Sequence, residues 1–589
     1  MKTFDVIVVG LGTAGAPCAL ACAKAGLKTL GLEACTGMGG QNTLGGVNFG
    51  GLTMADAARD LERAAEQVKA FLEIRYKTVP TEIGPFTNGV RHVKTVSNGL
   101  TDECAAKVII DCSGDAAAVR LAGGQTTLGR AFDARVNAVS KPVVLRTRSG
   151  YRPNYRLADL SLSGSWKDYS AGVMGLSDSA LARYDSREGN RAVAVPSLLG
   201  VREGARVVTE AVVTFRDCLL GRFTDQPVMC DYTPFDLCKE NRDWAFESDE
   251  AVTWAVLCGL NNFAFPAMLP YGAFVPKGVP GMLVASKHLG VDHDAAAGVR
   301  MMPQMRESGL IAATAAEIAV KRGLPVREVP VADLRVRLAA VGISTKPQKR
   351  TAGYYNLRGQ QPLPEATADI VAALETDLVQ LSSWVMPPRH DSGERAAAAL
   401  FAAWRKAERG EGKELAGALS DRLSSAPDRR KANMAFALGL MGDARGLSVL
   451  TEIVRQPGGK YDPAVAGAYP MRIKAIILLG RIGTADTVPL LMDIVRDGAR
   501  RFTSDLPLRD ETAKQASGWV NPYGEKSLDA WRFAALSYAL MALQKLLARF
   551  PNPALRAELV EWGRNIKSLN GGKNGADMAD LLRRAAQEK

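Results

Sequence analysis

A glycine-rich turn near the start of the chain, Gly10-Leu11-Gly12-Thr13-Ala14-Gly15, has the spacing that binds a phosphate group. The first glycine permits a tight turn, the second lets backbone N–H groups approach a pyrophosphate, and the third lets the next helix pack closely on the strand. The phosphate charge then lies at the positive end of the helix dipole. The turn therefore predicts a nucleotide site made by Gly10, Gly12, Thr13, Ala14 and Gly15.

The turn lies between a predicted strand and a predicted helix, as a nucleotide site of this kind requires. Residues 4–9 are a β-branched apolar run typical of a buried parallel strand, and the alanine-rich residues 16–25 predict a helix that ends at Gly26. A second strand over 28–32 ends at Glu33, whose carboxylate is placed to accept hydrogen bonds from both ribose hydroxyls of an adenosine. The order of these elements is that of a Rossmann-like βαβ unit.

The turn alone fits NAD as well as FAD. A second glycine-rich stretch follows the acidic residue directly and reads Met38-Gly39-Gly40-Gln41-Asn42-Thr43-Leu44-Gly45-Gly46. A loop without bulky side chains can lie flat against a pyrophosphate and the inner edge of an isoalloxazine, so this stretch favours a flavin. We therefore predict FAD as the cofactor, with contacts from Gly39, Gly40 and Gln41.

With these residues the chain resembles the FAD-dependent oxidoreductase family of the glutathione-reductase-like flavoproteins. The resemblance covers roughly residues 1–345 and is thin over 52–84 and 131–194. It continues in an apolar strand over 107–112 followed by Ser113-Gly114-Asp115, where the chain of family members crosses back beside the cofactor. The resemblance implies that Gly114 and Asp115 contact FAD.

The most specific part of the resemblance runs from Pro270 to Leu324. A strand over 281–285 is followed by a long alanine-rich helix that opens near Gly309. In the family this order brings the pyrimidine end of the flavin to a helix N-terminus, whose dipole stabilises negative charge on the reduced ring. The resemblance thus implies that Gly309 and Leu310 contact the cofactor.

Two short segments depart from the family pattern. Residues 198–207 are similar to the family's Arg-Glu-Ser-Arg-Arg-Ile segment, but Gly204 and Ala205 replace two expected side chains. At Cys238 a cysteine replaces a histidine that is common in relatives, and we interpret it as a small buried hydrophobic residue rather than a proton-transfer group. These departures leave open a protein whose flavin domain has lost catalysis.

Because a bound flavin performs hydride transfer itself, the protein has to position the substrate and manage one proton. The chain has 4 histidines, and two of them, His288 and His293, fall in the segment near the flavin. An imidazole titrates near pH ~6.5, which suits a base for an alcohol or an acid for a reduced alkene, and His293 is our first choice. Asp294 is expected to orient an imidazole or contact the flavin. Arg300 is expected to clamp a carboxylate or stabilise an oxyanion, although a helix-end role fits it equally well.

Composition limits the other classes of function. The 9 cysteines contain no Cys-x-x-Cys run, so we predict neither an iron–sulfur cluster nor a metal site. We expect the cysteines to be reduced thiols in a cytoplasmic protein. We see no secretory signal and no apolar run of the ~18 residues that a membrane helix needs. The net charge is +12, of which 31 basic against 23 acidic residues after residue 390 contribute +8. We interpret this charge as a solvated helical surface and predict neither a nucleic acid nor a membrane as partner.

After Pro387 the chain becomes rich in Ala, Leu and Arg with helical periodicity. Residues 438–444 match 479–485, and the apolar positions of 449–454 recur in 490–495, both at an offset of 41 residues. This period is typical of HEAT-like repeats, in which two-helix units bury their apolar faces against their neighbours. Such a region can dock on the flavin domain, cover the active site or bind a partner protein, and the sequence leaves these roles open.

We therefore expect a doubly wound α/β fold followed by an all-α solenoid. The expected domains are a FAD-binding domain over 1–130 and 269–350, an inserted α+β substrate region over 131–268, a linker over 351–388 and a HEAT-like domain over 389–589. The predicted function is that of an FAD-dependent oxidoreductase that transfers a hydride between the flavin and a small polar substrate, with a sugar hydroxyl as one candidate. The alternatives are a fumarate-reductase-like ene-reductase in which Arg300 grips a carboxylate, and a non-catalytic flavin-binding scaffold whose repeats recruit a partner.

Overall fold

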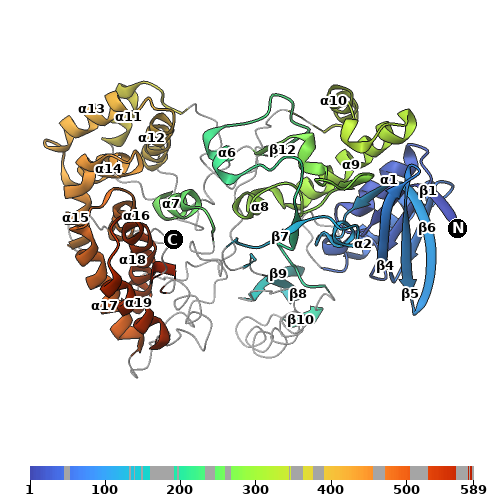
Figure 1. Ribbon diagram of the computed structural model, residues 1–589, viewed down its shortest axis with the longest axis horizontal. Helices are drawn as coiled ribbons and strands as arrows, with labels where there is room; N and C mark the ends of the chain where they lie inside the picture. The colour runs from blue at the N-terminus through green and yellow to red at the C-terminus, as the bar shows by residue number, and fades with distance from the viewer. Residues whose placement is uncertain are drawn as a thin grey trace. The chain divides into compact units, whose positions relative to one another are not determined.

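The computed structural model describes residues 1–45, 54–131, 134, 136–137, 139–147, 150–158, 191–194, 198–231, 246–258, 267–343, 345, 363–375, 391–455, 471–503, 528–565, 582 and 584–586. The chain divides into two compact units. The first comprises Met1–Ser248 and Phe265–Arg350, and the second comprises Asp249–Ala264 and Thr351–Lys589. Figure 1 labels the elements of both units.

The first unit is built on a seven-stranded sheet with the order β3-β2-β1-β6-β5-β4, and β14 pairs with β6. Strands β3, β2, β1, β6 and β14 run parallel, whereas β4, β5 and β6 form an antiparallel meander. The long β6 pairs with β5 through its first half and with β14 through its second. The bounds are β1 (Lys2–Val9), β2 (Thr29–Glu33), β3 (Leu72–Tyr76), β4 (Thr78–Thr87), β5 (Val90–Ser97), β6 (Leu100–Asp111) and β14 (Met282–Val284).

The centre of this sheet is buried and apolar. Ile7 of β1 and Ile109 of β6 lie in register with each other and are both fully buried. Parallel strands that are covered on both faces need such continuous apolar runs, which explains why residues 4–9 lack the alternation of a half-exposed strand. The arrangement confirms the predicted α/β fold with a Rossmann-like, mainly parallel sheet.

Two helices, α1 (Gly15–Lys24) and α9 (Met302–Arg322), pack against each other and against the sheet. Their approach is close enough to require glycine. A Cβ at Gly309 of α9 would lie 2.0 Å from the carbonyl oxygen of Ala14, and a Cβ at Gly15 would lie 1.7 Å from that of Gly10. The glycines at these two positions therefore set how deeply α1 and α9 sit. The unit also contains α2 (Met54–Gln67), α3 (Ala117–Leu121) and α10 (Val331–Ala340).

Smaller elements of the first unit lie within and on either side of the range 131–268, where the sequence predicts an inserted substrate region. They form antiparallel pairs and short helices whose bounds are β7 (Thr126–Leu128) with β11 (Ala205–Val207), β8 (Val139–Thr147) with β9 (Gly150–Ala158) and β10 (Arg191–Ala194), β12 (Met229–Asp231) with β13 (Ala267–Leu269), α6 (Phe215–Leu220) and α8 (His293–Val299). Strand β7 precedes residue 131 and α8 follows residue 268, so the elements around this region come from both of its sides.

The second unit is helical in all its described elements, which confirms the predicted helix-rich C-terminal region. It includes two helices from outside the range 389–589. The first is α7, in which the ring centroid of Trp254 lies 5.0 Å from that of Phe401 and 5.9 Å from that of Trp404. The second is α11, which falls within the range 351–388 and packs on α12. The bounds are α7 (Asp249–Cys258), α11 (Thr367–Leu374), α12 (Asp391–Glu408), α13 (Lys413–Leu423), α14 (Asp428–Leu440), α15 (Leu447–Arg455), α16 (Met471–Ile482), α17 (Thr487–Thr503), α18 (Leu528–Arg549) and α19 (Pro553–Asn565).

The two blocks of the sequence repeat form corresponding helices, α14 with α15 and α16 with α17. The guanidinium of Arg481 donates a hydrogen bond to the carbonyl of Leu440, 3.3 Å away and 41 residues earlier in the chain. A Cβ at Gly439 would lie 3.1 Å from that of Leu478, and one at Gly480 would lie 2.9 Å from the Cα of Ala542 in α18. Small residues at these crossings let α14, α16 and α18 pack closely, while the assignment to HEAT-like repeats stays a prediction.

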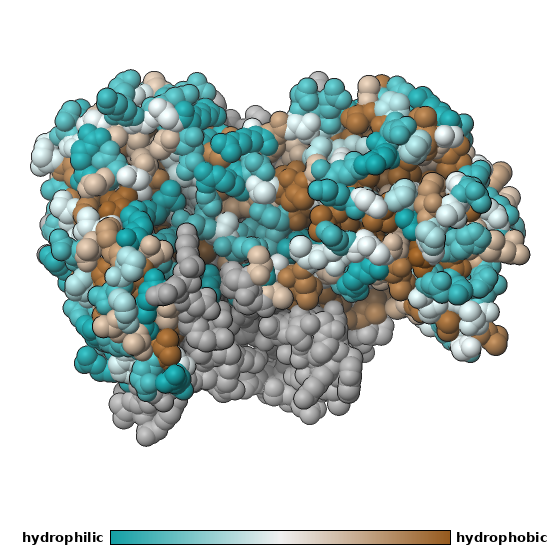
Figure 2. Space-filling model, viewed as in Figure 1, coloured by the Kyte–Doolittle hydropathy of each residue, from teal (hydrophilic) through white to brown (hydrophobic). Residues whose placement is uncertain are grey.

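Over its sequence ranges 249–264 and 351–589 the second unit has a net charge of +4, a third of the +12 of the chain. On the face shown in Figure 2, hydrophilic residues cover much of the described part of this unit. Among the described residues, we find no helix with the length and apolarity that crossing a membrane requires.

The approach of α9 to α1 yields a stability prediction. We expect Gly309→Ala to destabilise the first unit by about 1–3 kcal/mol, because the added methyl group overlaps the carbonyl oxygen of Ala14 and the helices must move apart. Thermal or urea unfolding measures this change in stability. The transition of the first unit is identified as the one that added FAD shifts. Gly417→Ala in α13 is the control, since a Cβ there meets no atom within 4 Å. It should be neutral or stabilise by up to ~1 kcal/mol. An unchanged midpoint for Gly309→Ala would contradict the packing described above.

Candidate flavin site

Three parallel strands of the first unit end side by side. Val9 of β1 and Val284 of β14 both pair with Asp111 at the end of β6. The segments that follow these strands are the glycine turn, Ser113-Gly114-Asp115 and Ser286-Lys287-His288. Ligands of open α/β sheets bind outside the carboxyl ends of the strands, so these three segments mark the expected site.

The glycine turn is shaped by backbone contacts that leave one position open. Gly10 has φ +85°, and a Cβ there would lie 2.8 Å from the Cα of Ser113. At Gly12, by contrast, a Cβ would meet only the Cα of Gly40, 4.0 Å away. Gly12 and Thr13 are partly exposed, whereas Ala14 and Gly15 are buried beneath them. Open space beside the N-terminus of α1 is what a bound pyrophosphate requires, so the turn fits the predicted cofactor.

The second glycine loop folds back over this turn. Gly39 has φ +96° and donates its N–H to the carbonyl of Leu11 at 2.8 Å, and a Cβ at Gly40 would lie 2.9 Å from the Cα of Gly12. The side-chain amide of Gln41 donates to the carbonyl of Leu199 at 2.7 Å. Its Oε1 is buried and has no hydrogen-bond partner among the described residues. The loop therefore lies against the turn as expected for one that covers a pyrophosphate, whereas Gly46 is outside the described residues.

Glu33 at the end of β2 is buried and holds the turn in place. Its Oε2 accepts a hydrogen bond from the N–H of Leu11 at 2.7 Å, and its Oε1 accepts one from the N–H of Cys35 at 2.8 Å. A carboxylate oxygen can accept more than one hydrogen bond, so each oxygen retains capacity for a ribose hydroxyl. The predicted ribose contact is compatible with this arrangement and stays a prediction.

Residues 198–207, which we call the crossing segment, run close to Gly114 and Asp115. A Cβ at Gly204 would lie 2.7 Å from Oδ1 of Asp115 and 2.8 Å from the carbonyl oxygen of Gly114. The N–H of Ala205 donates to the same Oδ1 at 2.9 Å. The glycine that departs from the family pattern is thus required by this close approach, and it is no sign of a degenerate site.

The crossing segment also contacts two other segments of the site. The carbonyl of Leu199 accepts the hydrogen bond from Gln41, and the carbonyl of Val201 accepts one from the ammonium of Lys287. It therefore connects the second glycine loop, the end of β6 and the end of β14. The side chain of Glu203, which belongs to this segment, contacts a separate group of buried polar residues.

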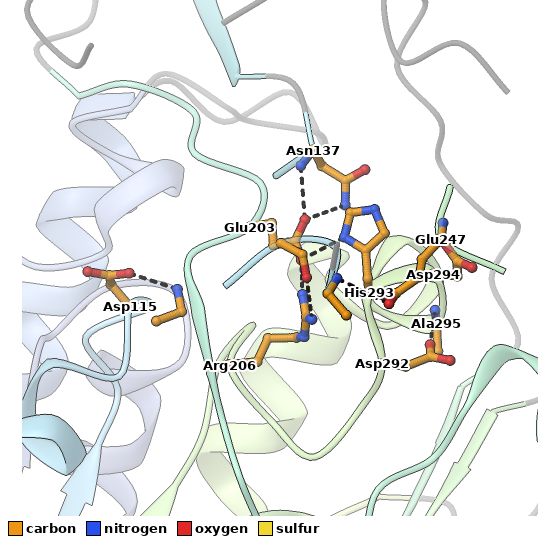
Figure 3. A network of polar contacts seen from close by, with 12 residues as sticks. Asp115, Asn137, Glu203, Arg206, Glu247, Asp292, His293, Asp294 and Ala295 are labelled. Carbon is orange, nitrogen blue, oxygen red and sulfur yellow. Dashed lines mark hydrogen bonds and ion pairs between the residues drawn. The ribbon is translucent and has the colours of Figure 1, made fainter. Parts of the chain in front are cut away.

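Glu203 lies at the centre of a buried polar cluster with His293, Arg206 and Asn137 (Figure 3). Its carboxylate accepts hydrogen bonds from Nδ1 of His293 at 2.9 Å, from the guanidinium of Arg206, and from the backbone and side-chain amides of Asn137 at 2.9 and 3.1 Å. A carboxylate only accepts, so Nδ1 of His293 carries the proton of this hydrogen bond. Glu203 thereby fixes the tautomer and the orientation of the imidazole.

Asp294 has a different partner from the one expected. Its carboxylate accepts the backbone N–H groups of Glu247 and Ser248 at 3.0 and 2.7 Å, and the carboxylate that receives the imidazole N–H is that of Glu203. Burial raises the pKa of Asp294. Burial and the neighbouring Asp294 also raise the pKa of Asp292, the N-cap residue of α8, to about 7.

The remaining predicted residues lie nearby. Arg300 caps the C-terminus of α8 and is partly exposed, and Leu310 follows Gly309 in α9. His288 is fully buried and its Nε2 donates to the carbonyl of Asp111 at 3.0 Å; burial lowers its pKa, so it is a neutral residue that braces the end of β6. Cys238 lies outside the described residues.

Ser286 and Lys287 of the site were not predicted from the sequence, and neither was Glu203. Ser286 has φ +81°, unusual for a residue with a side chain, and its N–H is held at 2.9 Å by the hydroxyl of Ser308 in α9. The stem of Lys287 passes Gly114, where a Cβ would lie 3.1 Å from Cε of the lysine. Their position directly after a strand that ends at the site was the available signal, while Glu203 could have been sought in the family-like segment over 198–207.

Comparisons with known proteins agree with the cofactor. Residues 167–338 match the family described as FAD dependent oxidoreductase. No protein with a curated description matches the chain. The family match indicates FAD as the cofactor, as the glycine segments predict, and it supports an oxidoreductase.

Solved structures resemble the chain only distantly. A geranylgeranyl bacteriochlorophyll reductase-like protein from Thermoplasma acidophilum has 13% identity and a TM-score of 0.33, over 58% of this chain and 84% of that one. p-Nitrophenol 4-monooxygenase from Pseudomonas putida has 13% identity and a TM-score of 0.32, over 56% and 84%. Thioredoxin reductase from T. acidophilum has 23% identity and a TM-score of 0.16, over 19% of this chain. The chain spans only 35% of that reductase's length.

The open space at Gly12 yields a binding prediction. We expect Gly12→Ala to fold with an unchanged unfolding midpoint in the absence of FAD, because the methyl group meets no atom closer than 4.0 Å. It should weaken FAD binding at least about tenfold, since the methyl group occupies the place of the pyrophosphate. Titration of the apoprotein with FAD, followed by flavin fluorescence, measures this. Equal FAD affinity in the two proteins would place the pyrophosphate elsewhere.

Proposed function

We propose that the first unit is an FAD-dependent oxidoreductase acting on a small polar substrate, with a hydroxyl group such as that of a sugar as the oxidised group. One observation carries this proposal. The crossing segment touches Asp115 through Gly204 and Ala205, and the preceding residue, Glu203, accepts the hydrogen bond of His293. A proton-accepting imidazole is therefore fixed by the segment that also lies on the predicted cofactor contacts.

In this proposal FAD is held by the residues predicted from the sequence. The pyrophosphate lies at the glycine turn and the second loop, the adenosine ribose at Glu33, and other parts of the cofactor at Gly114, Asp115, Gly309 and Leu310. The bound flavin supplies the acceptor for a hydride from the substrate carbon. The protein residues bind the substrate, exclude water and accept the hydroxyl proton.

His293 is the proposed proton acceptor. With the proton on Nδ1, the lone pair of Nε2 can take the hydroxyl proton as the carbon loses its hydride. The imidazole then becomes a cation, and the carboxylate of Glu203 stabilises that charge at 2.9 Å in a buried setting where charges are poorly screened. Arg206 and Asn137 keep Glu203 in position, so we assign these two residues a positioning role.

A second reaction is kept because of Arg300. This residue is close enough to Lys287 to lower the pKa of the lysine, so positive charge gathers beside the site. That charge would suit the carboxylate of an alkene acid that is reduced, with His293 returning a proton. A protein that takes up no FAD would instead favour the non-catalytic scaffold, in which the helical repeats recruit a partner.

Several predictions about the rest of the chain belong to this proposal. They are the domain boundaries at residues 130, 268, 350 and 388, the HEAT-like nature of the second unit, membership of the glutathione-reductase-like flavoproteins, and a cytoplasmic location. Their support is the glycine fingerprint, the 41-residue sequence repeat and the unpatterned cysteines. We propose that the second unit acts as a scaffold.

The predicted reaction can be tested by anaerobic mixing of the FAD-loaded protein with a panel of polyols, sugars and sugar acids. We expect at least one compound to bleach the flavin absorbance near ~450 nm. His293→Gln should slow this bleaching by about 10²–10⁴-fold, because the proton acceptor is lost. Glu203→Gln should slow it less, since an amide oxygen can still accept the Nδ1 proton but carries no charge.

His92→Gln is the matched control, because His92 lies on β5 and is exposed. It should bleach at the rate of the unmodified protein. The FAD affinity of all three variants should stay the same. Unchanged bleaching by the His293 variant would remove this histidine from the mechanism. Return of the flavin absorbance when the reduced protein is mixed with alkene acids, with no bleaching by any alcohol, would favour the ene-reductase.

A further inference from the structure

The proposed function leaves Lys287 without a role, although this residue lies among the segments of the site. It follows β14 by three residues and is partly exposed. Its aliphatic stem passes over Gly114, where only a glycine leaves room, and its ammonium donates to the carbonyl of Val201 in the crossing segment. The side chain therefore reaches from the end of one strand, past the end of a second, to the segment that carries Glu203.

The ammonium has more hydrogen-bonding capacity than the protein uses. A lysine ammonium has three N–H donors, and the carbonyl of Val201 takes one of them. The other two have no partner in the part of the chain that the structure describes. A partly buried ammonium with unused donors is a binding group for an oxyanion, provided that the surrounding charge does not already neutralise it.

The charged groups around Lys287 do not neutralise it. Burial, together with the nearby Arg300 and Arg202, lowers the pKa of Lys287 to about 8, and only the carboxylate of Asp115 opposes this shift. That carboxylate already binds the N–H of Ala205 and the guanidinium of Arg120 at 2.9 Å. His288, the next residue, is neutral and buried. The protein thus gathers positive charge at this edge of the sheet at a cost in stability.

Backbone strain at the preceding residue points in the same direction. Ser286 is held at φ +81° by its hydrogen bond to Ser308. Such a conformation is unfavourable for a residue with a side chain, and it recurs where a functional group has to be aimed. Here it fixes the point at which Lys287 leaves the strand.

We propose that Lys287 binds an oxyanion of the substrate, so that the substrate carries a carboxylate or phosphate group besides the group that is oxidised. This inference rests on the proposed function in taking the bound molecule to be the substrate. Val201, which the ammonium contacts, is two residues before Glu203, and two residues of extended chain span at most about 7 Å. Lys287 and His293 therefore contact nearby positions of one segment, which suits a small hydroxy acid or sugar acid.

An anion at Lys287 could also come from FAD, whose diphosphate carries the same chemistry. The geometry favours the substrate, because the open space for a pyrophosphate lies at Gly12 and Gly40, whereas Lys287 contacts the crossing segment near Glu203. Lys287→Met distinguishes the two sources. If the substrate supplies the anion, the variant takes up FAD as tightly as the unmodified protein.

The test uses the FAD-loaded full-length protein, titrated with inorganic phosphate and with malonate at pH 7. Binding is followed by the difference spectrum of the flavin and by the unfolding midpoint. We expect both anions to bind, Lys287→Met to weaken binding at least tenfold, and Lys287→Arg to retain it. Lys94→Met, which removes an exposed charge on β5 that pairs with Glu82, is the matched control and should bind normally.

The pH dependence provides a second readout. The ammonium is charged below its pKa and neutral above it, so with a pKa of about 8 the affinity for malonate, which stays fully ionised over this range, should fall about tenfold from pH 7 to pH 9. In Lys287→Arg the affinity should stay constant over this range, because an arginine keeps its charge. An equal loss in both proteins would assign the titration to another group and overturn the inference.

Two further outcomes would overturn it. One is the absence of anion binding by the unmodified protein, and the other is a tenfold or greater loss of FAD affinity in Lys287→Met, which would assign the lysine to the cofactor. These results are separable from a failure of the proposed function. Anion binding through Lys287 without bleaching by any alcohol would sink the oxidation, and bleaching without anion binding would sink only the inference.

Discussion

The approach of one backbone to another at Gly204 is the constraint on which the site depends. The crossing segment lies so close to Gly114 and Asp115 that no side chain fits at this position, and the N–H of Ala205 donates to the carboxylate of Asp115. A hydrogen bond to a charged group contributes about 1.5–3 kcal/mol, whereas forcing a Cβ to within 2.7 Å of an oxygen displaces the chain. Displacement here would move Glu203, the preceding residue, away from His293. The position of His293 thus depends on the contact of Gly204 with Gly114 and Asp115, although neither His293 nor Glu203 takes part in that contact.

Burial of Glu203 makes the polar cluster form as a unit. A carboxylate removed from water costs several kcal/mol, and this cost is offset only when its oxygens are satisfied. Four donors from Arg206, Asn137 and His293 do this, and in turn burial lowers the pKa of Arg206, which shows that the arginine also gives up solvation. Removing any one donor leaves the others around an incompletely satisfied charge, so the orientation of the imidazole and the stability of the segment are linked.

The sequence predicted those parts of the site whose chemistry is local. The glycines at 10, 12, 15, 39 and 40 act through their own backbone within a few residues, and their spacing identifies them. Glu203 was missed because it meets His293 across 90 residues, and no local pattern encodes that contact. Asp294 was expected to orient an imidazole or to contact the flavin, the first because it adjoins His293 in sequence. Successive residues of a helix point in directions about 100° apart, however, so at the start of α8 the carboxylate turns to the backbone of Glu247 and Ser248. Gly204 was interpreted as the loss of an expected side chain. Its close approach to Gly114 and Asp115 cannot be seen in the sequence, because the two segments meet only in the folded protein.

In the helical unit, too, local sequence patterns identify some helices and miss others that pack against them. Its periodicity after Pro387 is local and was recognised, whereas α7 carries no part of the repeat and comes from the middle of the chain. Trp254 of α7 nevertheless packs against both Phe401 and Trp404, and Asp249 forms ion pairs with Lys545 and Arg481. Without α7 those aromatic rings would face solvent and the two cations would lose their carboxylate. The helical unit is therefore completed by a segment that precedes Pro387.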